Sequence, residues 1–349
     1  MPSNDSMNKI LLQSPSDTLF EAPVYVEGES LLGCIGVVGM PTDWTHSSRI
    51  GARLGPEALR RATTRIMNEY VPATGDAFHD AVHGGSWRRN ANRWIVDMGD
   101  APIDPTSVEN TTASIAEMTQ YVRGQGGVPL ALGGDHYNSY PACLGYSSAL
   151  TEIDPDRRFG YIQIDGHLDF SDRLGAWGQF NHATNGRRIS ELPNIVRENM
   201  VWIGVTGWVS GGELSLIEEM GGKVYSSGDV HRLGARQVAE LAMEQATRGC
   251  DSLYLSMDID AMDAGYLPGT GSIVHSGITP KQYCDILDVI AKHPIDGMDI
   301  AEVAPTLDPS GRTEAISAHL LYSVVLNECW SLHDRVRRPQ GVRWAVPQW

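Results

Sequence analysis

The chain has 349 residues, of which 42% are hydrophobic and 20% charged, and its 43 acidic against 27 basic side chains give a formal net charge of -16. This composition is typical of a globular protein with a sizeable core and excludes a disordered chain. A surface this acidic repels phosphate backbones and anionic lipids, so we expect neither a nucleic-acid partner nor a membrane partner.

Two further features of the sequence indicate the cellular compartment of the protein. The amino-terminal stretch has no apolar core of the secretory type, and no apolar run reaches the roughly 20 residues that span a bilayer. The five cysteines are scattered and never form a CxxC pair, which is typical of reduced thiols. We therefore expect a cytoplasmic protein.

Residues 1–30 form a polar segment that we expect to be an irregular arm, and residues 31–349 alternate β-rich apolar runs with helical patterns. The runs that predict strands cover residues 34–40, 128–132, 160–165, 201–205, 253–260 and 298–303. The patterns that predict helices cover residues 55–70, 106–125, 235–249, 279–293 and 313–334. Thr106 and Thr279 are expected helix N-caps, and Pro56 and Pro280 suit a first turn.

Strands rich in Val, Ile and Leu on both faces, separated by helices, indicate a sheet that helices cover on both sides. The fold class is therefore α/β: a single-domain, three-layer α/β/α architecture with a central, mainly parallel sheet. Such sheets bind their ligands at the carboxyl ends of the strands.

Three of the predicted strands end in polar segments, which read GGDH, DGHLD and SMDID. In the second and third segments the ligand-type residues stand two apart, so on an extended backbone they share one face. Together the segments place six residues that can bind metals at the carboxyl end of the sheet, namely His136, Asp165, His167, Asp169, Asp258 and Asp260.

A single Asp after a strand is usually a turn former or a helix N-cap. Four carboxylates at one sheet end, however, repel one another unless cations lie among them. Two divalent cations balance that charge, and mixed His and Asp ligands suit Mn, Ni, Co, Fe or Zn better than Mg or Ca. The sequence therefore predicts a dinuclear metal site.

The chain resembles the ureohydrolases. The resemblance lies in the order and spacing of three segments, GGDH, DGHLD and SMDIDAMDAGYLPGTG, and in the segment SSRIGARLGPEALRR that leads into the first predicted helix. That family comprises arginases, agmatinases and other hydrolases of guanidino compounds, and the resemblance runs from about Cys34 to Pro305. It implies an arginase-like fold with the catalytic domain in residues 31–349. It also implies hydrolysis of a C–N bond in a linear amidine, with two divalent ions per subunit, Ni²⁺ or Mn²⁺.

The resemblance also implies a ligand set for each ion. One ion would be bound by His136, Asp165, Asp169 and Asp258. The other would be bound by Asp165, His167, Asp258 and Asp260. Asp165 and Asp258 would thus bridge the pair.

Three catalytic roles follow from the same resemblance. Asp169 would orient a water held between the two ions and take its proton, which gives the hydroxide that attacks the guanidino carbon. His182, in FNHATNG, corresponds to the proton shuttle for the leaving amine and would also contact the substrate. Glu302, in MDIAEVAP, corresponds to the glutamate that pairs with the substrate guanidinium through a planar two-oxygen face.

The sequence departs from the family pattern in three places. Gly166 stands where alanine is usual in the DGH segment, and Ala183 replaces glycine after the shuttle histidine. After PGTG the chain reads SIVHSGITP in place of a Pro- and Gly-rich stretch, so we expect Ile273, Val274 and His275 near the substrate mouth, with His275 in contact with substrate. Such a crowded mouth favours a small or N-alkylated guanidine, such as guanidine or the biguanide metformin, hydrolysed to urea or guanylurea. Agmatine and 4-guanidinobutyrate are the alternative substrates, followed by formiminoglutamate.

Other classes of protein fit less well. A dinucleotide-binding enzyme needs GxGxxG after the first strand, where this chain reads GVVGMPTDW. A metal store or sensor needs neither a shuttle nor a guanidinium-binding carboxylate, and His79 with His83 lack a carboxylate partner for a separate metal site. A supporting subunit of a heteromeric complex stays open as an alternative. The resemblance implies a homo-oligomer (a trimer or hexamer) or a hetero-oligomer with a homologous subunit.

Overall fold

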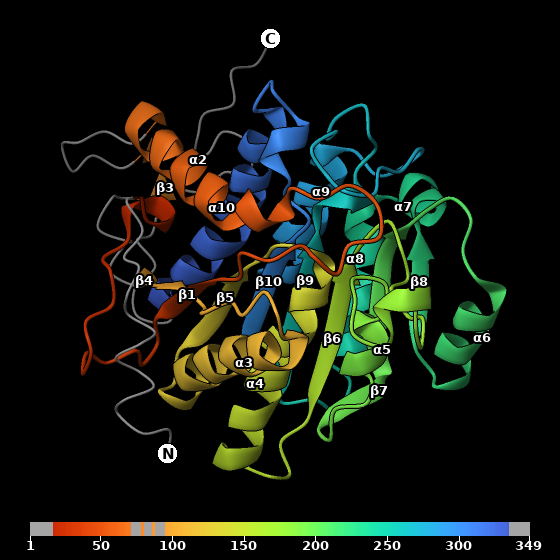
Figure 1. Ribbon diagram of the computed structural model, residues 1–349, viewed down its shortest axis with the longest axis horizontal. Helices are drawn as coiled ribbons and strands as arrows, with labels where there is room; N and C mark the ends of the chain where they lie inside the picture. Colours follow the sequence, from red (N-terminus) through yellow and green to blue (C-terminus); the bar gives the residue numbers. More distant parts are fainter. Residues whose placement is uncertain (1–16, 71–77, 80–85, 88–94, 335–349) are drawn as a thin grey trace.

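The computed structural model describes residues 17–70, 78–79, 86–87 and 95–334. An eight-stranded parallel sheet with the order β4-β1-β5-β10-β9-β6-β7-β8 crosses this part of the chain (Figure 1). Its strands are β1 (Ile35–Gly39), β4 (Ile95–Asp100), β5 (Val128–Leu132), β6 (Phe159–Ile164), β7 (Ile195–Val205), β8 (Lys223–Ser226), β9 (Ser252–Asp258) and β10 (Gly297–Ala301). The short strands β2 (Phe78–His79) and β3 (Ser86–Trp87) pair separately and antiparallel.

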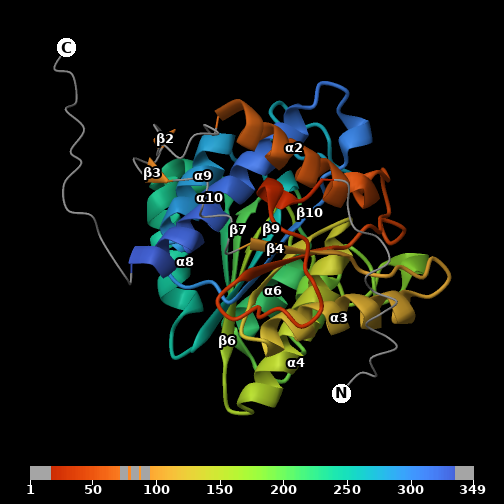
Figure 2. The ribbon, with the colours of Figure 1, turned by 90° about the vertical axis from the view of Figure 1, so that its left-hand side faces the viewer.

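Helices cover both faces of the sheet. They are α2 (Gly55–Tyr70), α3 (Val108–Gly124), α4 (Ser139–Ile153), α5 (Asn185–Ile189), α6 (Gly211–Glu219), α7 (Ser227–Leu233), α8 (Ala235–Ala246), α9 (Pro280–Ile290) and α10 (Arg312–Asp334). α3 and α4 pack together on one face, while α2, α10, α9 and α8 form a row on the other (Figure 2). This is the expected three-layer α/β/α fold.

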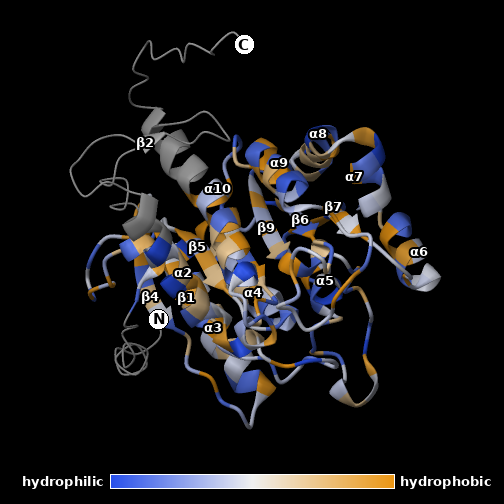
Figure 3. Ribbon diagram, turned by 90° about the horizontal axis from the view of Figure 1, so that it is seen from above, coloured by the Kyte–Doolittle hydropathy of each residue, from blue (hydrophilic) through white to orange (hydrophobic). Residues whose placement is uncertain are grey.

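Successive side chains of a strand point to opposite faces of the sheet, so each strand contributes apolar side chains to the core on both sides. In β6, Phe159 and Tyr161 pack toward α4, whereas Ile162 and Ile164 join the apolar cluster beneath α8 and α9. Both of those helices carry hydrophobic and hydrophilic residues (Figure 3), as helices lying on a sheet do. Of the amino-terminal arm, the described residues include Leu19 and Phe20, whose buried side chains belong to the same cluster.

The six predicted strands are present, with bounds that shift by a few residues and with β7 starting six residues earlier. β4 and β8, which the sequence did not indicate, form the two edges of the sheet. The predicted N-cap Thr106 is wrong: Ser107 caps α3 by accepting the Asn110 N–H at 3.1 Å, while the Thr106 hydroxyl donates to Asp104. Thr279 caps α9 in a capping box with Gln282, as predicted.

The strand order decides where the polar segments meet. β5, β10, β9 and β6 are consecutive neighbours in the middle of the sheet, with β1 beside β5. Their carboxyl ends lie at one edge because all of them run parallel. The segments after these five strands therefore come together although the sequence separates them widely.

Candidate metal centre and substrate pocket

The three segments that the sequence indicated come together at this edge, and their six ligand-type residues form two adjoining groups. His136 begins the turn after β5, Asp165 directly follows β6, and Asp258 is the last residue of β9. Each group brings its ligand atoms within 4.8 Å of one another.

The first group surrounds the His136 ring. Its Nδ1 atom lies 3.1 Å from Asp165 Oδ2, 2.8 Å from Asp169 Oδ2 and 3.0 Å from Asp258 Oδ2. The four residues are buried or nearly so, and they are the four predicted for one ion.

The second group surrounds His167, whose Nδ1 lies 3.1 Å from Asp260 Oδ2 and 3.5 Å from Asp165 Oδ1. Asp165 thus turns one oxygen toward each group, which is the arrangement of a bridging carboxylate. Asp258 belongs by distance to the first group only, and its Oδ1 accepts the Asp260 N–H at 2.8 Å, as Asp165 Oδ1 accepts the His167 N–H at 2.6 Å. The bridging role expected for Asp258 stays a prediction.

Buried partners hold these ligands in place. Gln163 Nε2 donates to Asp165 Oδ2 at 2.6 Å. His136 Nε2 lies 3.1 Å from the Ser256 hydroxyl, which donates to Asp299 at 2.9 Å. Such outer partners fix the orientation of a ligand ring and its tautomer.

The charges in the two groups fit a pair of cations. Burial, together with neighbouring carboxylates, raises the pKa of Asp258 and of Asp260, and it raises the pKa of Asp169 to about 7. Burial also disfavours a charged His136, but Asp258 and its neighbours hold the pKa of that imidazole well above its usual range. So many ionisable groups in one dry place ionise only with compensating charge, which two divalent ions provide.

Glu302 follows β10 and lies beside the first group. It has the left-handed φ of 66°, a strained conformation for a residue other than glycine. Its Oε1 accepts the His136 N–H at 2.9 Å, whereas the buried Oε2 has no hydrogen-bond partner. Burial and Asp258 raise the pKa of this carboxyl, so its ionised form is favoured when a cation lies against it.

Comparison with known proteins gives the family. A family model described as the arginase family matches residues 34–327. The chain belongs to the arginase family. As expected, it is therefore a hydrolase of the ureohydrolase type, which acts on C–N bonds of linear amidines.

Individual arginase-family relatives are distant. The chain is 27% identical to a guanidinopropionase from Pseudomonas aeruginosa, over 88% of this chain and 90% of the relative. It is 29% identical to a mitochondrial agmatinase from Gallus gallus, over 88% and 84%. The crystal structure of a hypothetical agmatinase from Burkholderia thailandensis is 26% identical, with a TM-score of 0.73 over 91% of each chain.

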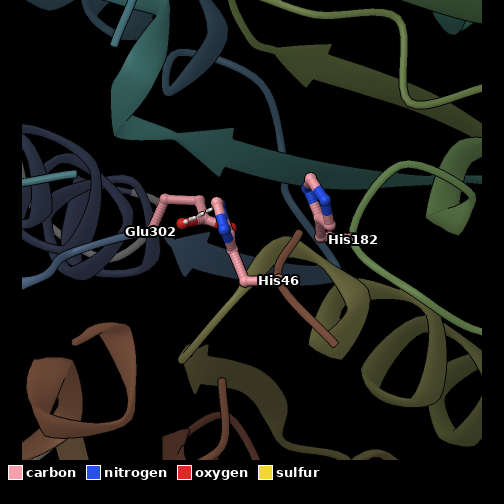
Figure 4. A group of neighbouring side chains, drawn as sticks. All are labelled: His46, His182 and Glu302. Carbon is pink, nitrogen blue, oxygen red and sulfur yellow. Dashed lines mark ion pairs between the residues drawn. The ribbon is translucent and has the colours of Figure 1, made fainter. Parts of the chain in front are cut away.

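The two histidines of the pocket come from different loops. His182, the predicted shuttle, is half-buried, and its Nε2 accepts the Ser47 N–H at 3.2 Å and lies 2.9 Å from the Ser47 hydroxyl. His46, which the sequence interpretation missed, lies between His182 and Glu302 (Figure 4). A signal existed, since TDWTHSS follows the first predicted strand just as the metal segments follow theirs.

His46, His182 and Glu302 also gather three potential ligand atoms, but they do not fit a further metal ion. The two imidazoles stack with centroids 4.3 Å apart and planes inclined by 19°. Imidazole lone pairs lie in the ring plane, so rings stacked face to face direct them past one another. We interpret this group as the wall of the substrate pocket.

The segment after PGTG lies across the same edge. Ser272 Oγ is 3.5 Å from His46 Nε2. Val274 is buried, and a Cβ atom on Gly166 would lie 2.8 Å from Val274 Cγ1. Gly166 and Val274, which both belong to places where the sequence departs from the family pattern, therefore lie against each other. Ile273 and His275 are exposed, and the His275 carbonyl accepts from Thr206. His83 lies outside the described residues.

Proposed function

We propose that the chain hydrolyses a small cationic guanidino compound, releasing urea and an amine or ammonia. The observation that carries this proposal is the position of Glu302. Its buried Oε2 has no hydrogen-bond partner, faces His46 Nε2 at 3.4 Å, and lies next to a carboxylate and histidine cluster that fits two divalent ions. A guanidinium supplies both the N–H donor and the positive charge that this oxygen lacks.

In this proposal the chain's residues have distinct tasks. The six residues of the two groups would hold two divalent ions, Mn²⁺ or Ni²⁺, which would supply a hydroxide nucleophile near neutral pH because coordination lowers the pKa of water. Asp169 orients that nucleophile from its position against His136. Glu302 holds the guanidinium so that its carbon faces the ligand groups. His182 gives a proton to the leaving amine.

The hydrogen bonds of His182 determine which nitrogen of its neutral ring carries the proton. Its Nε2 accepts the Ser47 N–H, so the neutral ring carries its proton on Nδ1. Burial and the adjacent His46 lower the pKa of His182 to about 3, so the ring is neutral near pH 7, and it takes up a proton for the amine only when Nε2 gives up the Ser47 N–H.

Two classes of guanidino compound are candidate substrates, and each is supported by a different observation. The named relatives act on guanidinopropionate and agmatine, which supports a guanidino compound with a charged alkyl chain. Guanidine or an N-alkylated guanidine, including metformin, is favoured by a specific observation: His46 lies close against Glu302, and Ser272 lies beside His46.

A product assay tests the proposal. Protein loaded separately with Mn²⁺ and with Ni²⁺ would be incubated with guanidine, metformin, agmatine, 4-guanidinobutyrate and arginine, and urea, guanylurea and amines would be measured. We expect urea or guanylurea from at least one of the first four compounds. If protein with both ions bound releases neither product from any compound, the proposal is wrong for the isolated chain. Adding a homologous subunit then tests the supporting-subunit alternative.

A further inference from the structure

Three successive residues after β1 each contact a different part of the proposed site. Thr45 donates its N–H and its hydroxyl to Asp135 Oδ2, at 3.0 and 2.7 Å. His46 Nε2 lies 3.4 Å from Glu302 Oε2. Ser47 bonds to His182. The backbone of this segment, residues 44–49, is therefore fixed by the site that it borders.

The His46 side chain has no room to swing away from Glu302. It is 5% exposed, and a Cβ atom on Gly271 would lie 2.4 Å from its Nε2, so only glycine fits there. Arg49 fixes the glycine loop by donating to the carbonyls of Thr270 and Gly271 at 2.6 and 3.3 Å. On its other face the ring stacks on His182.

The hydrogen bonds of His46 determine what it presents to a substrate. Its Nδ1 accepts the Ser48 N–H at 3.0 Å, so a neutral ring carries its proton on Nε2, toward Glu302. Burial lowers the pKa of His46 to about 4, which leaves the ring neutral at pH 7. The wall beside Glu302 therefore offers a donor and an apolar ring face. The neutral ring itself offers neither a free acceptor for an ammonium group nor a charge for a carboxylate.

We propose that His46 is a specificity-determining residue that limits the length of the substrate. Held by Glu302, Gly271 and His182, its imidazole closes the guanidinium pocket against long aminoalkyl or carboxyalkyl chains. The pocket then takes guanidine or a guanidine with a short, uncharged substituent. This inference rests on the proposed function and names the substrate class of the same site.

A homologous series of n-alkylguanidines separates length from charge. We would measure kcat/KM from guanidine to n-pentylguanidine on metal-loaded protein, and the binding of the matching N-alkylureas, which are not substrates, by calorimetry. For the unaltered chain we expect kcat/KM to fall by at least about tenfold between methylguanidine and butylguanidine, since a substituent that does not fit costs on the order of 1–3 kcal/mol. The alkylureas should show the same limit in Kd.

His46→Ala should reduce that fall to less than about threefold, chiefly through KM, because removing the ring opens the pocket. His46→Gln, which keeps a similar reach and an N–H donor, should retain the limit. His293→Ala removes an exposed histidine after α9 and serves as the control. Metal content and thermal unfolding would show that each variant is folded and loaded.

The outcomes distinguish the two proposals. If His46→Ala binds both ions and its length dependence equals that of the unaltered chain, His46 does not limit the substrate. The same conclusion follows if the unaltered chain hydrolyses butylguanidine as well as methylguanidine, while the proposed function stands. If no guanidino compound is hydrolysed, both proposals fail together.

Discussion

At the scale of single residues, Asp165 joins the two ligand groups, with Oδ2 toward His136 and Oδ1 toward His167. The Asp260 carboxylate belongs to the second group alone. We therefore expect Asp165→Asn to lose both ions and Asp260→Asn to retain one. Elemental analysis of dialysed protein gives the number of ions per chain. Equal losses in the two variants would contradict the assignment of Asp165 as the shared ligand.

Glu302 has the substrate role in this account, and its contact with the metal ligands is limited to the His136 N–H. Glu302→Gln keeps the shape of the side chain but removes its charge. We expect metal content to be preserved while KM for a cationic guanidine rises by about tenfold or more, because a charge-assisted bond becomes a neutral one. Steady-state kinetics on variants of known metal content measure this. An unchanged KM would remove Glu302 from the guanidinium site.

His46 also gives a pH dependence of stability. Burial lowers its pKa from 6.5 to about 4, so between these values the unfolded chain binds a proton that the folded chain excludes. The contribution of His46 to the free energy of unfolding is fully present above pH 6.5 and is lost as the pH falls toward 4. At pH 5 the loss amounts to about 2 kcal/mol relative to pH 7.5.

Urea unfolding of chelator-treated protein at pH 7.5 and pH 5 tests this sign. His46→Gln lacks the titrating ring, so it should lose about 2 kcal/mol less than the unaltered chain over this interval, other groups being common to both. A loss of the same size in both proteins would show that His46 is not excluded from protonation by the fold.

At the scale of elements, the site consists of segments that follow parallel strands, and a sequence indicates only some of them. GGDH, DGHLD and SMDID stand out because several ligand-type residues are close together in each, so all six members of the two groups could be predicted. His46 stands alone among residues of ordinary type, and only the position of β1 beside β5 shows that it reaches Glu302.

The pair formed by Gly166 and Val274 also belongs to this scale. A methyl group on Gly166 would lie 2.8 Å from both Val274 Cγ1 and the Asp260 carbonyl oxygen. We expect Gly166→Ala to destabilise the fold by about 1–3 kcal/mol through overpacking. Adding Val274→Ala should recover part of this loss. Denaturant unfolding of both single variants and the double variant measures the coupling, and strictly additive effects would contradict the contact.

At the scale of the whole molecule, the α/β/α class followed from buried strands alternating with helical patterns. The edge strands β4 and β8 were not predictable in this way, because β8 is short and only partly buried and β4 carries acidic residues in its run. Within the described ranges, no helix is long and apolar enough to cross a membrane, and Cys34, Cys143 and Cys250 are free thiols. Whether the chain forms trimers, hexamers or a hetero-oligomer stays a prediction for light scattering.

The central claim is that two metal ions act together beside Glu302, and a titration of activity against bound metal tests it most directly. Metal-free protein would receive Mn²⁺ or Ni²⁺ in steps, and urea release and bound metal would be measured on the same samples. The account predicts that activity rises only as occupancy passes one ion per chain and reaches its maximum at two. Full activity at one ion per chain, or in metal-free protein, would contradict it.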